Sequence, residues 1–208
     1  MVIEKIVLGY LQTNAYVLHV EGSSEAILID PCEKAKDIEE ALEKQGLVVK
    51  YVLLTHGHYD HIGACSYFQN RQAKIYIHKN DADKTTSPDN LNSKMYGEKI
   101  VPFKADVLLE GNETLNLAGL EIKVLSTPGH TSGSVCYFIE DSIFSGDTLF
   151  EGSYGRTDFA DGSFSQIAKS LRTLLNLKKN YKVFCGHGNN TSIFYEKNNN
   201  LILNDIDL

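Results

Sequence analysis

The sequence predicts an α+β fold in which two mixed β-sheets pack together and helices cover their outer faces. Two observations lead to this prediction. Groups of strand-like apolar runs followed by helical segments occur twice along the 208 residues, without the strict strand–helix alternation of a doubly wound sheet. A hydrophobic content of 42% allows a sizeable core, in one large domain or two small ones.

Apolar periodicity in the first half predicts five strands and two helices. The strands are expected at Val2–Leu8, Ala15–Val20, Ala26–Ile29, Tyr51–Leu54 and Lys74–Ile77. The first helix places Ile38 and Leu42 on one face and ends at Gly46. The second is expected over Gly63–Gln72, and the polar stretch 79–99 has no assignable pattern.

The second half predicts five more strands and one long helix. The strands are expected at Asp106–Leu109, Glu121–Leu125, Val135–Ile139, Ser142–Phe144 and Lys182–Cys185. Ser163 and Gln166 form a capping box before a helix that has Ile167, Leu171 and Leu174 on one stripe.

Charge and composition restrict the class of partner. The formal net charge is −7, whereas nucleic acids and anionic membranes are bound through clustered Lys and Arg, so we expect neither as a partner. The apolar N-terminal segment is interrupted by Glu4, Lys5, Gln12 and Asn14. It therefore provides neither a signal-peptide core nor a membrane span, and we expect a cytoplasmic protein whose oligomeric state the sequence leaves open.

The four cysteines are dispersed, and none belongs to a Cys-x-x-Cys pair. They are Cys32, Cys65, Cys136 and Cys185. Such spacing favours reduced, buried thiols over a disulfide framework or a thiolate zinc site.

The segment Thr55–His61 contains three histidines and an aspartate directly after a predicted buried strand. Residues two apart on an extended segment point the same way, so His56, His58 and Asp60 can converge, and His61 follows at the turn into a helix. Imidazole and carboxylate together suit zinc, iron or manganese. The absence of nearby thiolates favours a catalytic site over a closed structural one.

Three further candidate ligands end other apolar runs, and each is flanked by glycine: His130, Asp147 and His187. Seven ligands exceed the four that one zinc ion accepts, whereas two metals that share a carboxylate and a water use all of them. Two such ions hold a water that is deprotonated near neutral pH and stabilise the oxyanion of an attacked carbonyl or phosphoryl group. The sequence has no Gly-x-Ser-x-Gly, Walker or dinucleotide-binding motif, so metal-dependent hydrolysis is the favoured chemistry.

Four motifs occur in order between about residue 10 and residue 191: His-x-His-x-Asp-His, Thr-Pro-Gly-His-Thr, Gly-Asp-Thr-Leu-Phe and a final Gly-His. They resemble the metallo-β-lactamase superfamily and, within it, the glyoxalase II group of hydroxyacylglutathione hydrolases. The resemblance implies an αββα sandwich, one domain over residues 1–208, with two zinc ions between the edges of the sheets. Iron or manganese could replace the zinc.

The resemblance also implies ligand roles. His56, His58 and His130 would hold the first metal, Asp60, His61 and His187 the second, and Asp147 would bridge them. A metal-bridging hydroxide would attack the thioester carbonyl of a small acyl-thiol, with D-lactoyl-thiols as the leading candidates. Asp60 and Asp147 are the expected catalytic carboxylates.

Two departures from full-length glyoxalase II concern the substrate. Only 21 residues follow His187, too few for the helical C-terminal domain that supplies much of the glutathione pocket in that family, so we expect no such domain and leave the thiol carrier open. Arg156 stands where the family has a thiol-binding Lys, and Asp158 where it has a Tyr. Arg156 could bind a substrate anion or pair with Asp158 or Asp161, and Tyr154 could close over the thiol or serve packing.

Alternatives remain open. The run Gly-Arg-Thr-Asp-Phe is shared with persulfide dioxygenases, which bind one iron through two His and one Asp, here His56, His130 and Asp147. A hydrolase of lactone, β-lactam or phosphodiester bonds would keep the same fold, although a nuclease of this type needs a basic extension that is not visible. The last alternative is a binding module that keeps the metals without catalysis.

Residues near the motifs have weaker assignments. His19 and His78 are expected to be structural, with His78 a possible residue of the site entrance. Asp30 could cap a turn or support a metal ligand. Three threonines could orient ligands through hydrogen bonds: Thr55, Thr131 and Thr191.

Overall fold

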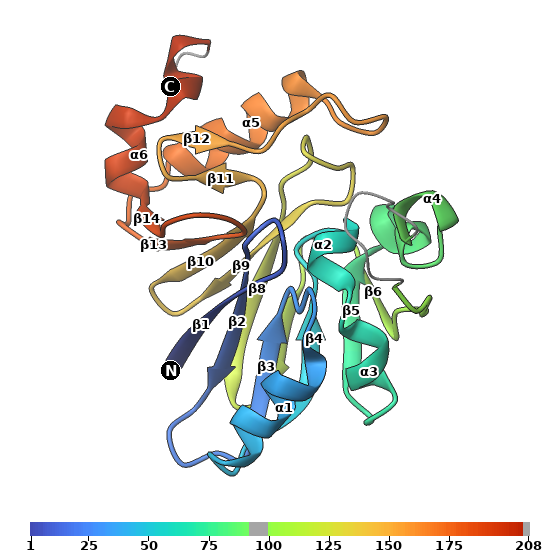
Figure 1. Ribbon diagram of the computed structural model, residues 1–208. Coiled ribbons are helices and arrows are strands. Elements are labelled where there is room, and N and C mark those ends of the chain that lie inside the picture. The colour runs from blue at the N-terminus through green and yellow to red at the C-terminus, as the bar shows by residue number, and fades with distance from the viewer. Residues whose placement is uncertain (92–99, 206–208) are drawn as a thin grey trace.

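The structure is a computed structural model that describes residues 1–91 and 100–205, and it has the predicted α+β architecture of two packed mixed sheets (Figure 1). The first sheet consists, in spatial order, of β1 (Val2–Leu8), β2 (Thr13–His19), β3 (Glu25–Ile29), β4 (Val48–Leu53), β5 (Lys74–His78) and β6 (Val107–Leu109). The strands β1 to β3 are antiparallel, whereas β3 to β6 run parallel. The parallel half directs the carboxyl ends of β3 and β4 toward one edge.

The second sheet consists, in spatial order, of β14 (Thr191–Ser192), β13 (Lys182–Cys185), β10 (Ser142–Gly146), β9 (Val135–Ile139), β8 (Leu120–Ser126) and β7 (Thr114–Leu117). Only β10 and β13 pair in parallel, so these two strands also end at the same edge. A small hairpin of β11 (Leu149–Phe150) and β12 (Ser153–Tyr154) follows β10.

The helices lie outside the sheets (Figure 1). They are α1 (Ala35–Glu43), α2 (Tyr59–Ile62), α3 (Cys65–Gln69), the 3-10 helix η1 (Lys79–Thr85), α4 (Pro88–Leu91), α5 (Phe164–Leu175), α6 (Ile193–Asn199) and the 3-10 helix η2 (Leu201–Asn204). The Ser163 hydroxyl accepts a hydrogen bond from Gln166 N, which confirms the predicted cap of α5.

The predicted helix over Gly63–Gln72 is too long: the segment contains the short helix α3 over Cys65–Gln69, and a separate short helix, α2, precedes it. The N–H of Ala64 donates to the carbonyl of Pro31 at 2.9 Å instead of continuing the helical ladder. At Gly63 an added Cβ would lie 1.9 Å from the carbonyl oxygen of Cys32. Close backbone contact with the β3–α1 loop therefore keeps α2 and α3 separate.

The core has three apolar layers. Along β2, Ala15 and Val17 pack toward α1 and α3, whereas Tyr16 and Leu18 pack between the two sheets. This alternation follows from the two-residue period of a strand. A third layer lies beneath α5 and α6. The result is the αββα sandwich, which places the strand ends of both sheets next to each other.

Other expectations have clear outcomes. The strand expected at Tyr51–Leu54 begins earlier, at Val48, because Val48 pairs in parallel with Glu25 of β3. The short strands β7, β11, β12 and β14 were not predicted. All four cysteines are free and buried, as expected. No helix within the described ranges is long and apolar enough to cross a membrane.

Candidate metal centre

The seven side chains predicted as ligands meet at the edge where strands of both sheets end. His56 and His58 lie in the loop after β4, and Asp60 and His61 lie in α2. The second sheet contributes the other three: His130 from the β8–β9 loop, Asp147 directly after β10, and His187 directly after β13. Loops far apart in the sequence therefore form one cluster.

The first group consists of His56, His58 and His130, whose candidate ligand atoms all lie within 4.8 Å of one another. Nδ1 of His58 is 2.9 Å from Nε2 of His130. The second group consists of Asp60, His61 and His187 and meets the same distance criterion.

Asp147 lies between the two groups. Its Oδ1 is 3.4 Å from Nε2 of His61, and its Oδ2 is 3.4 Å from Nε2 of His130 and 3.5 Å from Nε2 of His187. A single carboxylate thus reaches imidazoles of both groups, the position that a bridging ligand requires.

Two buried atoms of the cluster have no hydrogen-bond partner among the described residues: Nε2 of His56 and Oδ1 of Asp147. A buried polar atom without a partner is costly and calls for an explanation. The donor set of five imidazoles and two carboxylates suits a divalent zinc, iron or manganese ion. The residues present therefore fit divalent metal ions.

The charge state of the cluster also suits cations. Burial lowers the pKa of His56 well below its usual range and that of His58 to about 4, which keeps these imidazoles neutral. Burial alone would raise the pKa of Asp147, but His61 and His187 hold it well below its usual range. Against the effect of burial, the neighbouring carboxylates raise the pKa of His61 to about 9 and that of His187 to about 10. Without metal, protons on these two imidazoles balance the carboxylates.

Hydrogen bonds at the far nitrogens orient the imidazoles. Nδ1 of His61 donates to Oδ2 of Asp30 at 3.0 Å, and the same carboxylate accepts bonds from the N–H and hydroxyl of Thr55 at 2.8 and 2.6 Å. Because the Thr55 hydroxyl donates to Asp30, its oxygen accepts from Nδ1 of His56 at 3.1 Å. Asp30 and Thr55 therefore hydrogen-bond the imidazoles of two candidate ligands, the contacts that a supporting role would require.

Backbone carbonyls support two more ligands. Nδ1 of His130 lies 2.8 Å from the carbonyl oxygen of Arg156, and Nδ1 of His187 lies 3.1 Å from that of Leu11. A carbonyl only accepts, so each Nδ1 donates, and Nε2 is the nitrogen of each ring that faces the cluster.

Sequence reasoning missed Asp81, which is 0% exposed. Its carboxylate accepts hydrogen bonds from Gly57 N at 2.8 Å, the Thr131 hydroxyl at 2.8 Å, Gly133 N at 3.0 Å and Lys84 Nζ at 3.0 Å. It thereby connects the loop of His56 and His58 to the loop of His130. Asp81 lies in η1, within a polar stretch whose sequence shows no motif, so only its buried contacts reveal it.

Phe159 was also missed. Its ring centroid lies 4.7 Å from that of His58 and 5.7 Å from that of His130, so it forms a wall beside the first group. Arg156 forms a bidentate ion pair with Asp158 at 2.6 and 2.5 Å, one of the two alternatives for its side chain. Tyr154 packs toward the third core layer, with its ring 6.4 Å from that of Phe164.

The remaining candidates have local partners. His78 accepts from Asn80 N and contacts the carbonyl of Glu110, and His19 contacts the carbonyl of Val20. Thr191 donates to Glu196 and orients no ligand.

The sequence model described as "Metallo-beta-lactamase superfamily" matches residues 8–187. The chain belongs to this superfamily. It is 33% identical over 205 residues to the probable metallo-hydrolase YqgX of Bacillus subtilis, with 96% of both chains covered. It is also 33% identical over 212 residues to the hydroxyacylglutathione hydrolase GloC of Haemophilus influenzae, covering 98% of this chain and 99% of that protein.

Solved structures agree in fold. The BLEG-1 B3 metallo-beta-lactamase has a TM-score of 0.90 at 35% identity and covers 97% of this chain and 99% of its own. TTHA1623 in a di-iron-bound form has a TM-score of 0.84 at 32% identity, with coverage of 96% and 99%. ETHE1 from Myxococcus xanthus has a TM-score of 0.83 at 29% identity, with coverage of 100% and 86%. This member of the metallo-hydrolase superfamily thus has a fold that binds divalent metal ions, with a His and Asp cluster to hold them.

Proposed function

We propose that the protein is a binuclear metal-dependent hydrolase that cleaves a small acyl-thioester. The observation that carries the proposal is the convergence of two three-residue ligand groups on one shared carboxylate, Asp147. His56, His58 and His130 would hold one ion and Asp60, His61 and His187 the other. Zinc is the preferred metal of the proposal, and the same donors accept iron or manganese.

The bound ions supply a Lewis-acidic centre that makes water nucleophilic near neutral pH and stabilises the developing oxyanion. The protein's own residues fix this centre. The low pKa of Asp147 keeps it ionised between the two groups, and Thr13 donates to Oδ2 of Asp60 at 3.3 Å, which orients that carboxylate toward His187. Asp60 and Asp147 are the catalytic carboxylates of the proposal.

In the reaction the water oxygen forms a bond to the acyl carbon and the carbon–sulfur bond breaks. The sulfur leaves with the bonding electron pair and takes up a proton, so the products are a carboxylic acid and a thiol. The similarity to the hydroxyacylglutathione hydrolase GloC supports a thioester substrate, with D-lactoyl-thiols as the first compounds to test.

The loop beside the first group is the proposed place of the thiol carrier. Phe159 offers an apolar wall next to His58 and His130, and the guanidinium of Arg156 lies 4.6 Å from the Phe159 ring. Since Asp158 already pairs with Nε and Nη2 of Arg156, a carrier carboxylate would share the guanidinium with Asp158 or compete with it. Tyr154 contributes through packing of this loop.

An iron-dependent persulfide dioxygenase is the second candidate, supported by the similarity to ETHE1 and by the shared Gly-Arg-Thr-Asp-Phe run. That reaction needs one iron at His56, His130 and Asp147. The tight second group of Asp60, His61 and His187 favours two ions instead.

Metal analysis combined with two assays separates these candidates. We expect about two ions per chain by inductively coupled plasma mass spectrometry and hydrolysis of a D-lactoyl thioester. One iron per chain, with oxygen consumption on a glutathione persulfide and no thioester cleavage, overturns the proposal.

Asp147→Asn tests the role of the shared carboxylate. We expect thioester kcat/KM to fall by about 100-fold or more because the bridging charge is lost. Asp141→Asn is the matched control, since Asp141 is an exposed carboxylate paired only with Lys179 at the surface. Unchanged turnover in Asp147→Asn removes this residue from the mechanism.

A further inference from the structure

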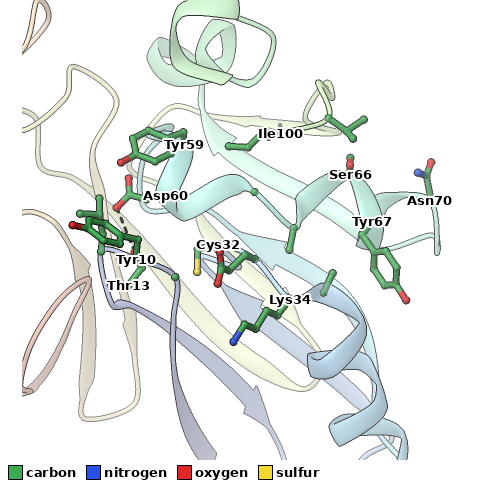
Figure 2. Close-up of a pocket in the computed structure, with 17 residues that line it drawn as sticks. Tyr10, Thr13, Cys32, Lys34, Tyr59, Asp60, Ser66, Tyr67, Asn70 and Ile100 are labelled. Carbon is green, nitrogen blue, oxygen red and sulfur yellow. Dashed lines mark hydrogen bonds between the residues drawn. The ribbon is translucent and has the colours of Figure 1, made fainter. Parts of the chain in front are cut away.

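A pocket of about 450 Å³ lies beside the candidate metal centre (Figure 2). Its walls come from the β1–β2 loop (residues 9–13), the β3–α1 loop (residues 32–35), α2, α3 and residues 100–101. Small-molecule sites occupy roughly 300–1,000 Å³, so the pocket has room for a substrate group. We call it the α2 pocket.

The α2 pocket meets the centre at Asp60, the one member of the seven-residue cluster among its lining residues. Figure 2 shows Asp60 with Thr13, Tyr10 and Tyr59 at one end of the pocket, and the hydrogen bond from Thr13 to Asp60. The same oxygen of Asp60 lies 3.3 Å from Nε2 of His187. A group in the pocket therefore adjoins the second ligand group, whereas the Phe159 wall lies beside the first.

The rim of the α2 pocket is apolar and exposed. Tyr10 is 83% exposed and Val101 58% exposed, and Leu11 and Ile100 lie beside them in the lining. Exposed apolar side chains that surround a cavity next to a reactive centre are typical of a ligand site.

Charge is sparse in the α2 pocket. Among the residues that the structure describes, the charged lining residues apart from Asp60 are the neighbours Glu33 and Lys34, whose charges cancel. For a thiol carrier with several carboxylates, the pocket offers one cationic partner, Lys34, next to the anionic Glu33. An uncharged chain needs no ionic partner and therefore suits the pocket better. Lys34 also has a left-handed backbone, with φ 52 and ψ 40, and such strain in a non-glycine residue is often found at functional sites.

We propose that the α2 pocket receives the acyl group of the substrate and selects an uncharged aliphatic or aromatic chain larger than lactoyl. The inference rests on the proposed thioester hydrolysis. A thioester that lies across the centre has one end at each ligand group. Beside the first group the Arg156 guanidinium offers a carrier carboxylate a partner in competition with Asp158, whereas the rim of the α2 pocket is apolar. The pocket beside the second group therefore takes the acyl chain.

The first experiment measures kcat/KM of the metal-loaded protein on N-acetylcysteamine thioesters with acetyl, hexanoyl and phenylacetyl groups. Each buried methylene adds to binding, so we expect a preference of about tenfold or more for hexanoyl or phenylacetyl over acetyl. A second series keeps the acyl group and changes the thiol. A preference that follows the thiol and not the acyl chain overturns the proposal.

Two variants test the place of the chain. Ser66 lines the pocket from α3, so Ser66→Phe narrows it, and Tyr10→Ala removes part of its exposed rim. We expect each to reduce the ratio of hexanoyl to acetyl kcat/KM by about fivefold or more. Ser165→Phe on α5 and Tyr195→Ala on α6 are matched controls outside the pocket and should leave the ratio unchanged. Circular dichroism shows whether each variant folds. Tyr10 is exposed, so Tyr10→Ala should fold, and this variant decides the result if Ser66→Phe does not fold.

A binding measurement separates this inference from the proposed function. The probe is the non-hydrolysable ketone analogue of the hexanoyl thioester, titrated calorimetrically into metal-loaded wild type, Tyr10→Ala and Ser66→Phe. If the variants weaken probe binding at least fivefold and wild type shows no thioester turnover, the acyl-pocket inference is supported and the proposed hydrolase function is overturned. If wild type hydrolyses thioesters but neither variant changes the ratio of hexanoyl to acetyl kcat/KM or the affinity for the probe, the acyl-pocket inference is overturned. The proposed hydrolase function then stands.

Discussion

At the residue scale, the ligand candidates could be predicted because they are close in sequence or follow clear apolar runs. His56 and His58 are two residues apart after β4, and Asp60 follows in α2 and not, as expected, on the same extended segment. The structure brings all three beside His130 and His187. The spacing of these residues indicated which side chains could converge. It did not indicate which buried residues hydrogen-bond to them. Asp81 accepts hydrogen bonds from Gly57 N and the Thr131 hydroxyl, which are far from it in the sequence. A pattern of neighbouring residues cannot predict such contacts.

Substitution of Asp81 should weaken metal binding at the first ligand group more than at the second. In Asp81→Asn an NH₂ group replaces one carboxylate oxygen and cannot accept a hydrogen bond. Either the bonds from Gly133 N and Lys84 Nζ to Oδ1 are lost, or the bond from Gly57 N to Oδ2 is lost. Both His loops beside Asp81 should loosen, and we expect metal affinity at the first group to fall by about 10- to 100-fold.

Metal titration under competition with a chelator measures this effect. The second group has its own support in Asp30, so one ion per chain should be retained more tightly than the other. Asp83→Asn, at an exposed position of the same η1 helix, should bind both ions as wild type does. Equal weakening of both ions in Asp81→Asn would contradict a local role.

At the element scale, the sequence predicted most long strands and the cap of α5, because their patterns depend on local periodicity and a local hydrogen bond. The sequence did not predict the bounds of elements that depend on tertiary contacts. The helix expected from Gly63 begins only at Cys65, after the backbone contact between Gly63 and Cys32, and the start of β4 at Val48 depends on its parallel partner. Neither the loop contact nor the pairing is visible in the segment itself.

The close approach of β10 and β13 makes Gly186 a second critical position. An added Cβ there would lie 2.2 Å from Oδ1 of Asp147 and 3.0 Å from Cε1 of His61. Gly186→Ala should push the Asp147 carboxylate out of place, and a shift of about 1 Å can cost about 100-fold in turnover. We expect kcat/KM and the number of bound ions to fall together.

Gly46→Ala is the comparison for Gly186→Ala. Gly46 has φ +73 and open space around its Cβ position at the end of α1, so alanine costs about 1 kcal/mol of stability without touching the centre. Its metal content should match wild type. If Gly186→Ala loses only stability and keeps both ions, the strand ends do not set the position of Asp147.

At the scale of the whole molecule, the centre joins the two halves of the sandwich. His56, His58, Asp60 and His61 follow strands of the first sheet, whereas His130, Asp147 and His187 follow strands of the second. Ions held by both sets bind the folded state and not the unfolded chain, so they stabilise the association of the sheets.

Metal removal should therefore lower the melting temperature. A ligand at about 100 times its Kd adds about 2.7 kcal/mol to the free energy of unfolding, which corresponds to about 5–10 °C for a chain of this size. Calorimetric melts before and after chelation measure the shift, with ion content determined in the same samples. Asp147→Asn, which loses the shared carboxylate, should show a smaller shift on chelation. A melting temperature that stays constant while both ions are removed would mean that the ions occupy the site without linking the sheets.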